Sequence, residues 1–338
     1  MIYSTTNNTA SVMLSPAERY CILGYHLIIV ISSLIGDTIV LVATIKYRAI
    51  KLHKFIVGLI VHIAVCDLTL TFSYVMPAAI SLAADGWIFG NLLLCIRVYV
   101  TWFSFSASVF FVCALTSSKL FILKHPLRSR SLTERNVHVM CGCIWIISGY
   151  MPTLFFIIDK DDVKFDPLTY YGEYGYNAAT WDWLVPLSAT LLAAIPNTVT
   201  IVNTICITLY LVEARNVARV SGGRLVWHGL LTVVATAVVC SVASMPMALY
   251  FVTSRQNMFE GRSADSFHVV ARYLTLLNVM SNFFIYCVTV PSFRKFIKIK
   301  VFGKGDPSVN HTRREFNFVL DIHINHIYHI CIGILSLN

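Results

Sequence analysis

Seven long apolar runs divide the chain, and they constrain its fold more than any other feature. Each run is long enough to cross a bilayer as an α-helix, for which about 20 apolar residues suffice. Only 13% of the residues are charged, whereas soluble domains carry about 25%. The sequence therefore predicts an all-α membrane protein. The predicted spans are residues 22–46, 55–81, 92–123, 137–158, 183–212, 225–252 and 268–290.

Basic residues gather in every second segment between these runs. Lys46 and Lys54 lie in the first such segment, and Lys124 and Arg128 lie in the next. The opposite segments are acidic or mixed, as at Glu173 after the fourth run. Because cytoplasmic loops carry an excess of Lys and Arg, we predict an extracellular amino terminus and a cytoplasmic carboxyl terminus. The net charge of +9 then indicates anionic lipid of the bilayer as the partner, and no nucleic acid is expected.

The two ends of the chain differ from the apolar body. Residues 1–21 form a polar tail without the apolar core of a signal peptide, and the tail contains a glycosylation sequon at Asn7. Residues 22–302 form the predicted bundle. Residues 303–338 form a cytoplasmic tail that ends in alternating Ile and His. Because a lone strand has nothing to pair with, we expect this tail to be disordered.

No pattern in the sequence indicates catalysis or a metal site. Most of the ten Cys lie inside apolar runs, where Cys behaves as a small hydrophobic residue. There is no Cys-x-x-Cys pair or Cys/His cluster. No Ser/His/Asp set or pair of acids falls on one face of a span. We therefore predict that the protein is not an enzyme and has no metal or organic cofactor.

The last apolar run carries polar side chains that a simple membrane anchor would lack. Asn278, Asn282 and Tyr286 are four residues apart and so lie on neighbouring parts of one helical face. Because amides are costly in lipid, this face should point into a bundle. Pro291 ends the run, and residues 292–302 mix Phe and Ile with Arg and Lys. This mixture predicts an amphipathic eighth helix on the cytoplasmic membrane surface.

This run and the helix after it resemble the seventh and eighth helices of rhodopsin-like (class A) G-protein-coupled receptors. The family's Asn-Pro-x-x-Tyr stands here as Asn282-Phe283-Phe284-Ile285-Tyr286, and Phe in place of Pro also occurs in some peptide-receptor branches. The resemblance covers about residues 22–302. It implies a multi-pass plasma-membrane receptor that binds an extracellular ligand and acts on a heterotrimeric G protein. Other similar motifs, in the family's order, are Gly36-Asp37-Thr38-Ile39-Val40, Ile63-Ala64-Val65-Cys66-Asp67-Leu68, Trp87-Ile88-Phe89-Gly90, Lys124-His125-Pro126-Leu127, Trp145, Pro196 and Pro246.

Three motifs that serve coupling depart from the family's pattern. Ser118-Lys119-Leu120 stands where the family has Asp-Arg-Tyr at the end of the third helix. Lys keeps a positive charge but lacks the planar fork of Arg, and the acidic partner is missing. Ser244 replaces the Trp of Cys-Trp-x-Pro, and Thr204 stands where a Tyr of the fifth helix is expected. With Tyr286, the residues at 118–120 are the expected coupling site, and their departures put conventional signalling in doubt.

These departures leave alternatives open. A decoy or non-signalling receptor of the same fold is the first of them. A transporter is disfavoured by the odd number of spans and by the absence of an internal repeat. Residues 159–182 contain no Cys, so Cys95 lacks the partner that the family usually provides, and Cys21 is expected to be too distant.

The resemblance implies a polar centre inside the bundle. It places Ser108, Asn278 and Asn282 around Asp67, and these are the residue types that coordinate a sodium ion in this family. A hydrogen-bonded core without an ion is the alternative. Asp37 replaces an Asn that contacts this acid through water. Since two carboxylates in a low dielectric resist double ionisation, we expect one to be protonated unless a cation lies between them.

The outer half of the bundle is the expected ligand pocket. Thr101 stands where amine receptors carry Asp, and Leu276 stands where opsins carry the Schiff-base Lys, so neither an amine nor retinal is expected. Arg97 and Arg272 favour an anionic group, and hence a peptide or a small anionic ligand. The alternative is that either Arg faces outward or pairs with a loop acid such as Asp265. The residues expected to line the pocket are Arg97, Thr101, Phe105, Met247, Tyr250, Phe251, His268 and Arg272.

Overall fold

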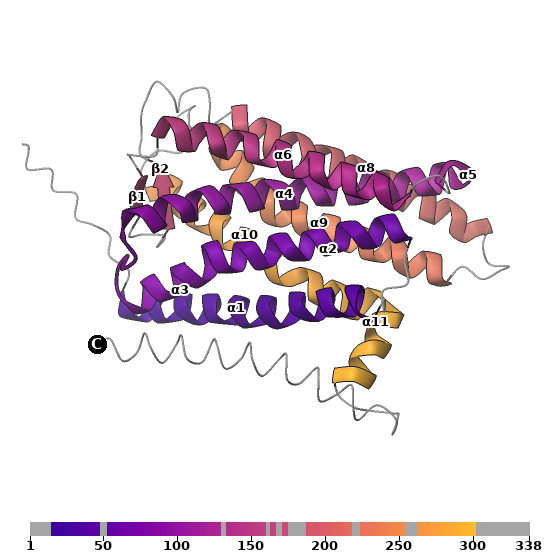
Figure 1. Cartoon of the computed structure of the whole chain (residues 1–338), viewed down its shortest axis with the longest axis horizontal. Helices are drawn as coiled ribbons and strands as arrows, with labels where there is room; N and C mark the ends of the chain where they lie inside the picture. The colour runs from indigo at the N-terminus through magenta and orange to yellow at the C-terminus, as the bar shows by residue number, and fades with distance from the viewer. Residues whose placement is uncertain are drawn as a thin grey trace, which may run out of the picture.

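The protein is a bundle of long helices lying roughly side by side in the computed structural model (Figure 1). The structure describes residues 15–47, 53–129, 133–159, 163–166, 171–174, 187–217, 224–253 and 262–301. Within these ranges, seven helices are long and apolar enough to cross a membrane. The predicted seven-helix bundle is therefore confirmed. The sequon at Asn7 and the tail 303–338 lie outside the described residues.

The seven spans follow the apolar runs closely. Their largest extensions beyond the runs are at the polar amino ends of the first and the last span. In chain order, the spans are α1 (Pro16–Ile45); α2 (Lys54–Leu70), η1 (Thr71–Val75) and α3 (Met76–Ala83) together; α4 (Gly90–Lys124); α6 (Glu134–Asp159); η3 (Thr190–Ala194) with α8 (Ile195–Val217); α9 (Arg224–Thr253); and α10 (Arg262–Thr289).

A capping box explains why α1 begins before its apolar run. Ser15 Oγ accepts a hydrogen bond from the Glu18 N–H at 3.3 Å, and the Ser15 N–H donates to Glu18 Oε2 at 2.8 Å. Pro16 occupies the first helical position, where its missing N–H has no cost. Arg19 then pairs with Asp85 at 2.6 Å. The start of α1 is thereby tied to the turn after α3.

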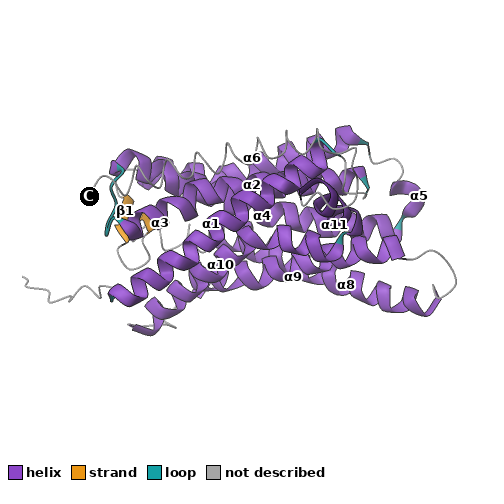
Figure 2. Ribbon diagram, turned by 90° about the horizontal axis from the view of Figure 1, so that it is seen from below, coloured by secondary structure: helices purple, strands orange, loops and turns teal. Residues whose placement is uncertain are grey.

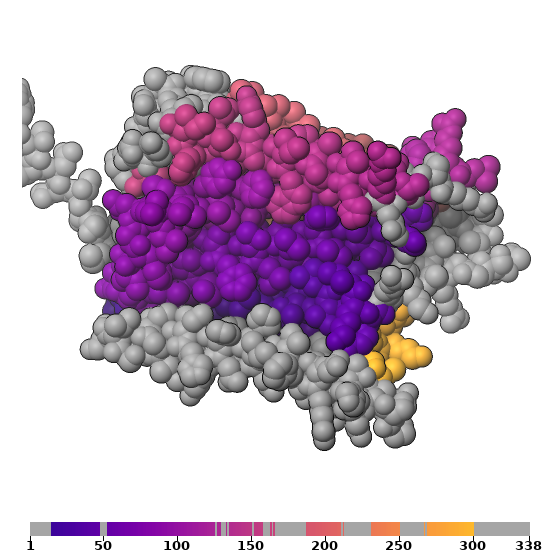
Figure 3. All heavy atoms as spheres, in the orientation of Figure 1, coloured from indigo at the N-terminus to yellow at the C-terminus, as the bar shows by residue number. Residues whose placement is uncertain are grey.

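The helix α4 lies in the middle of the bundle. It packs against α2, α6, α8 and α9, while α1 packs against α2 and α10 and closes the ring. On the face formed by α2, α4 and α6 the side chains make a closed surface (Figure 3). The largest apolar cluster joins residues of these helices with those of α9 and α10. Side chains of α4 therefore meet every functional region described below.

A strand hairpin lies at one end of the bundle (Figures 1 and 2). Its strands, β1 (Val163–Asp166) and β2 (Tyr171–Tyr174), pair antiparallel, with Val163 opposite Tyr174. The Phe165 ring lies 6.0 Å from the Trp87 ring, centroid to centroid. The sequence analysis did not predict these strands.

Two short helices lie at the opposite end, α5 (Pro126–Ser129) and α11 (Pro291–Phe296) (Figures 1 and 2). A π-helical turn, η6 (Ile297–Val301), continues α11. Phe293 and Phe296 are buried, whereas Arg294 and Lys295 are exposed. This two-sided segment occupies the residues for which the amphipathic eighth helix was predicted. Its place on the membrane surface stays a prediction.

Two spans contain a π-helical turn that the sequence analysis did not predict. The turn η1 ends at Val75, two residues before Pro77, and η3 ends at Ala194, two residues before Pro196. Proline has no N–H, so the carbonyl four residues before it loses its helical donor. Turns of this kind disturb the regular ladder and are frequent at functional sites. Both of these turns lie toward the end of the bundle that carries β1 and β2.

A glycine lets α1 pack directly against α10. A Cβ atom added at Gly36 would lie 2.6 Å from Phe283 Cβ and 2.8 Å from Phe283 Cγ. Real side chains do not come so close. Phe283 is also the residue that stands in place of the proline in Asn282-Phe283-Phe284-Ile285-Tyr286. The contact therefore joins the first helix to the most distinctive motif of the seventh.

We predict that Gly36→Ala destabilises the protein by about 1–3 kcal/mol, the usual cost of overpacking a filled core. Gly24→Ala is the matched control, because Gly24 lies in the same helix with no atom within 4 Å of an added Cβ. The control should be neutral or slightly stabilising, since Ala is the better helix former. Thermal unfolding of the purified protein in detergent measures both. Equal melting temperatures for Gly36→Ala and Gly24→Ala would show that α1 and α10 can move apart enough to accommodate the added methyl group.

Candidate functional site

A buried polar centre links the second and seventh spans. Asn282 Nδ2, on α10, donates a hydrogen bond to Asp67 Oδ2, on α2, at 2.5 Å. One turn earlier on α10, Asn278 Nδ2 donates to Ser108 Oγ on α4 at 3.4 Å. All four side chains are buried. The structure thus places Asp67 and the three residues that the resemblance groups around it in two hydrogen-bonded pairs, one turn apart on α10.

Asp37 joins this centre through hydroxyl groups. Ser33 Oγ donates to Asp37 Oδ2 at 2.7 Å and lies 2.6 Å from Thr71 Oγ1, which donates to the Asp67 carbonyl at 2.8 Å. The two hydroxyls carry only two hydrogens for these three contacts. A proton on the Asp37 carboxyl would supply the third. Asp37 and Asp67 also lie close enough to interact electrostatically.

Four oxygen atoms of the centre are buried without a hydrogen-bond partner among the described residues. They are Asp37 Oδ1, Asp67 Oδ1, Asn282 Oδ1 and Tyr286 Oη. Buried polar atoms are normally paired, so this set calls for a further partner such as water or an ion. Carboxylate, amide and hydroxyl oxygens are the ligands that hard cations prefer. The residues present therefore fit a sodium ion, and they would equally hold water.

Arg97 is engaged by the π-helical turn of the second span. Its Nε donates to the Ser73 carbonyl and one terminal nitrogen donates to the Tyr74 carbonyl, both at 3.2 Å. Ser73 lies four residues before Pro77, so its carbonyl lacks the helical N–H that any other residue at 77 would offer. The guanidinium also lies 5.1 Å from the centre of the Trp87 ring. Arg97 thus replaces a missing backbone donor, a role that sequence reasoning missed.

The other residues expected in the ligand pocket are spread around the outer half. Arg272 is buried on α10, and the Thr101 hydroxyl is buried on α4 without a hydrogen-bond partner among the described residues. The Tyr250 ring lies 6.4 Å from that of Phe267. Phe251 and His268 lie on α9 and α10, but their side chains are outside the described part of the structure.

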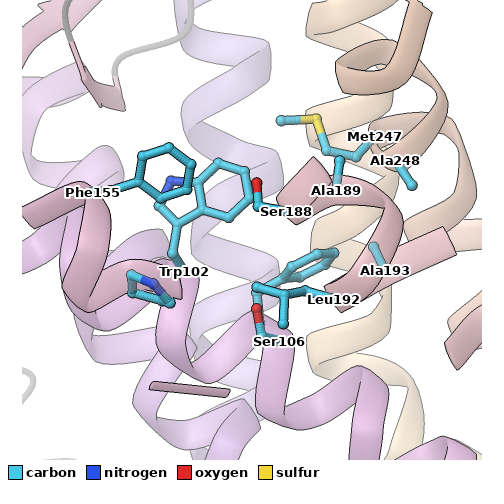
Figure 4. A pocket seen from close by; sticks show the side chains of 11 residues that line it. Trp102, Ser106, Phe155, Ser188, Ala189, Leu192, Ala193, Met247 and Ala248 are labelled. Atoms are coloured by element: carbon cyan, nitrogen blue, oxygen red, sulfur yellow. The ribbon is translucent and has the colours of Figure 1, made fainter. Parts of the chain in front are cut away.

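A cavity lies beside these residues, between α4, α6, η3 and α9 (Figure 4). About 400 Å³ of space lies between these residues, a figure that includes open solvent. Phe105 and Met247, both expected in the pocket, line it, whereas Arg97 and Arg272 do not. Sequence reasoning missed the lining on the fourth and fifth spans because it followed the third, sixth and seventh spans only, and it also missed some residues on the third and sixth spans. The prolines of the fourth and fifth spans were the available signal. The missed lining residues are Trp102, Ser106, Pro152, Phe155, Ser188, Ala189, Leu192, Ala193 and Ala248.

The end of α4 near α5 contacts α8 through polar groups. Asn203 Nδ2, on α8, donates to Ser117 Oγ at 2.8 Å and to Thr116 Oγ1 at 3.4 Å. Ser118, Lys119 and Leu120 follow directly on α4 and are partly buried, and Leu120 packs against the largest apolar cluster. Tyr286, the fourth residue of the expected coupling site, is buried on α10.

Ser244 forms a bond that a Trp could not form in the same way. Its hydroxyl contacts Asn197 Oδ1 on α8 at 3.0 Å and its own helix at the Cys240 carbonyl at 2.6 Å. Thr275 Oγ1 on α10 lies 3.1 Å from the Ala243 carbonyl, to which it donates. Small polar side chains therefore hold α9 to both neighbours near Pro246. Cys21 is a free thiol, so no bridge from Cys21 to Cys95 is present.

The comparisons with known proteins agree with this arrangement. The family described as "7 transmembrane receptor (rhodopsin family)" matches residues 36–286, well over half of the chain. The protein belongs to the rhodopsin family of seven-transmembrane receptors. Members of this family are signalling receptors and not enzymes.

Individual relatives match over shorter stretches. A gonadotropin-releasing hormone receptor from Octopus vulgaris is 27% identical over 157 residues, which are 44% of this chain and 37% of the relative. A D(5)-like dopamine receptor from Takifugu rubripes is 29% identical over 126 residues, 36% of this chain and 26% of the relative. A D(1C) dopamine receptor from Xenopus laevis is 27% identical over 127 residues, with the same two coverages. The chain thus matches well under half the length of these relatives.

We predict that Arg97→Met destabilises the protein by about 2 kcal/mol, the order expected for losing hydrogen bonds from a charged group. The cost should be smaller in a Pro77→Ala background, because the restored N–H can then serve the Ser73 carbonyl. Arg294→Met is the control, since Arg294 is exposed on α11. The melting temperatures in detergent of the unmodified protein, Arg97→Met, Pro77→Ala and the double variant give the coupling energy between positions 97 and 77. An equal cost in both backgrounds would show that Arg97 does not replace the proline's missing donor.

Proposed function

We propose that the protein is a plasma-membrane receptor that transmits binding of an extracellular ligand to a cytoplasmic heterotrimeric G protein. One observation carries this proposal. The polar centre at Asp67 and Asn282 joins α2, α4 and α10. Its Ser108 lies two residues after Ser106 of the cavity lining on α4, and the basic helix α11 follows the carboxyl end of α10. Ligand contacts at the cavity and partner contacts near α11 would both act on helices that meet at this centre.

The distribution of charge supports an extracellular amino terminus. The end of the bundle with α5 and α11 carries exposed Lys124, Arg128, Arg294 and Lys295. The opposite end carries acids, as at Asp85, where Arg19 pairs. Cytoplasmic segments are the basic ones in membrane proteins. The cavity, β1 and β2 therefore face the outside in our proposal, and α11 faces the cytoplasm.

We propose a peptide or a small anionic molecule as the ligand. The printed names of the relatives divide between a releasing hormone and dopamine, so they do not select one class. Thr101 offers a hydroxyl where an amine ligand would need a carboxylate, which disfavours dopamine. Arg97 donates to two carbonyls of η1, and Arg272 is buried on α10. Both remain cationic candidates for an anionic group of the ligand.

A non-signalling receptor of the same fold is the second candidate, and two observations favour it. Ser118 cannot form the salt bridge that an acid at this position provides in the family. Ser244 ties α9 to α8 through Asn197, at the position where the family has a large aromatic residue.

Restoring the family's motif tests the coupling proposal. We expect Ser118→Asp combined with Lys119→Arg to increase G-protein activation over the unmodified receptor, because the pair supplies the missing acid and the planar fork. Lys119→Arg alone is the control and should have a smaller effect. A panel of G-protein dissociation sensors in transfected cells, with peptide and small-acid libraries, measures basal and ligand-driven activity. Unchanged activity across the panel would favour the non-signalling receptor.

We also propose that sodium binds at the polar centre and stabilises the resting packing. An ion at ten times its dissociation constant adds about 1.4 kcal/mol to stability. The melting temperature in sodium chloride should therefore exceed that in choline chloride at equal ionic strength. Asp67→Asn should abolish the difference, whereas Asp85→Asn, at the bundle end, should keep it. If Asp37 is the ionised member of the pair, Asp37→Asn removes the difference instead. No sodium effect in the unmodified protein would leave a hydrogen-bonded core without an ion.

A further inference from the structure

Two threonine hydroxyls join the sixth span to the seventh span near α11. Thr232 Oγ1, on α9, donates a hydrogen bond to Thr289 Oγ1, on α10, at 2.7 Å. Thr289 Oγ1 in turn donates to the Ile285 carbonyl of its own helix at 2.6 Å. Because a hydroxyl carries one hydrogen, Thr289 can only accept from Thr232 in this arrangement. Both threonines are buried, so the bond between the two helices is shielded from water.

The Thr289 side of this bond belongs to a firmly packed corner of the bundle. Thr289 is the last residue of α10, and α11 follows directly after Val290. Phe293 of α11 is fully buried, and its ring lies 6.3 Å from the Tyr286 ring of α10, centroid to centroid. The Phe296 ring lies 5.2 Å from the Tyr47 ring, just after the end of α1. The end of α10 is therefore fixed against α11, and α11 is fixed against the end of α1.

The Thr232 side belongs to a helix with few polar ties at this level. Residues 231–250, whose side chains on α9 the structure describes, include no charged residue, so an ion pair cannot hold this part of the helix. The Thr275 hydroxyl of α10 donates to the Ala243 carbonyl at 3.1 Å, but that contact lies about three helical turns from Thr232. Thr236, one turn along α9 from Thr232, has a buried hydroxyl without a hydrogen-bond partner among the described residues. Near α11, the hydrogen bond of Thr232 is thus the polar contact that ties α9 to α10.

We propose that the Thr232–Thr289 pair is a latch, and that its opening releases this end of α9 from the corner formed by α10 and α11. The inference rests on the proposed receptor function, for which it names two positioning residues. One such hydrogen bond changes an equilibrium about fivefold, so the latch biases the packing without locking it. The Thr236 hydroxyl lowers the cost of opening, because it can gain a partner such as water when the helices separate. The Thr275 contact stays in place meanwhile, since it lies in the other half of the bundle.

The test compares variants that keep the shape of a threonine with variants that keep its hydroxyl. The measurement is hydrogen–deuterium exchange of the purified full-length protein in detergent, read by mass spectrometry. We expect Thr289→Val to speed exchange in residues 224–236 about fivefold, the factor for one lost hydrogen bond. Thr289→Ser keeps the hydroxyl and should exchange as the unmodified protein does. Thr208→Val is the control, because Thr208 is exposed on α8 and donates to the Thr204 carbonyl of its own helix.

A second variant approaches the bond from the other helix. Thr232→Val should act as Thr289→Val does, and it tests the latch even if Thr289→Val fails to fold. In the Thr232→Val background, Thr289→Val should add little, because the bond is already lost. A merely destabilised protein would instead exchange faster in all spans. The latch is overturned if the folded Val variants leave exchange in 224–236 unchanged, if Thr289→Ser acts as Thr289→Val, or if exchange rises equally in α4.

G-protein activation separates this inference from the proposed function. In transfected cells, the two Val variants should raise basal G-protein dissociation about fivefold, in line with the change in exchange. Faster exchange at α9 without any G-protein dissociation would uphold the latch and reject the proposed signalling. Activation by the variant with Ser118→Asp and Lys119→Arg, with unchanged exchange in both Val variants, would uphold the signalling and reject the latch.

Discussion

A backbone carbonyl inside a bilayer cannot accept a hydrogen bond from water, so it needs a donor within the protein, and the architecture of this protein depends on that constraint. Pro77 deprives the Ser73 carbonyl of its helical donor, and Arg97 of the neighbouring span supplies two N–H groups to Ser73 and Tyr74 in its place. Because the same guanidinium lies over the Trp87 ring, the second span, the third span and the turn between them form one unit. Arg97, a charged residue in the outer half of the bundle, therefore donates hydrogen bonds to the backbone of the second span.

The same constraint concentrates polar side chains in a few places. Asp67, Asn278 and Asn282 bond across three helices, and Asp37 is joined to them by hydroxyls of Ser33 and Thr71. Because the centre contains two carboxylates, its net charge depends on whether they bind a proton or a cation. Such a centre can bias the packing of the helices that meet around it. The cavity in the outer half is the opposite case, since none of the side chains that line it is charged.

The sequence was sufficient to predict the features that follow from composition and period. The seven spans are each a long apolar run, and the amide face of the last span follows from the spacing of Asn278 and Asn282. The π-helical turns were not predictable in this way, because hydropathy does not register one extra residue in a turn. The role of Arg97 was not predictable either, because it depends on the packing that brings the Ser73 carbonyl of the second span within hydrogen-bond distance of the Arg97 guanidinium. The cavity depends on which small side chains meet across four spans, and that requires the packing itself.

The contact between Gly36 and Phe283 limits how the first and seventh helices can move. No atom separates the glycine backbone from the aromatic side chain, so the two helices cannot come closer at this level. The seventh helix also lacks the proline that would let it bend at position 283. A movement of α10 toward α1 at this level would therefore require Phe283 to leave its place against Gly36. Tyr286 lies three residues further along α10, so the packing at Gly36 also fixes where the most buried residue of the coupling motif can lie.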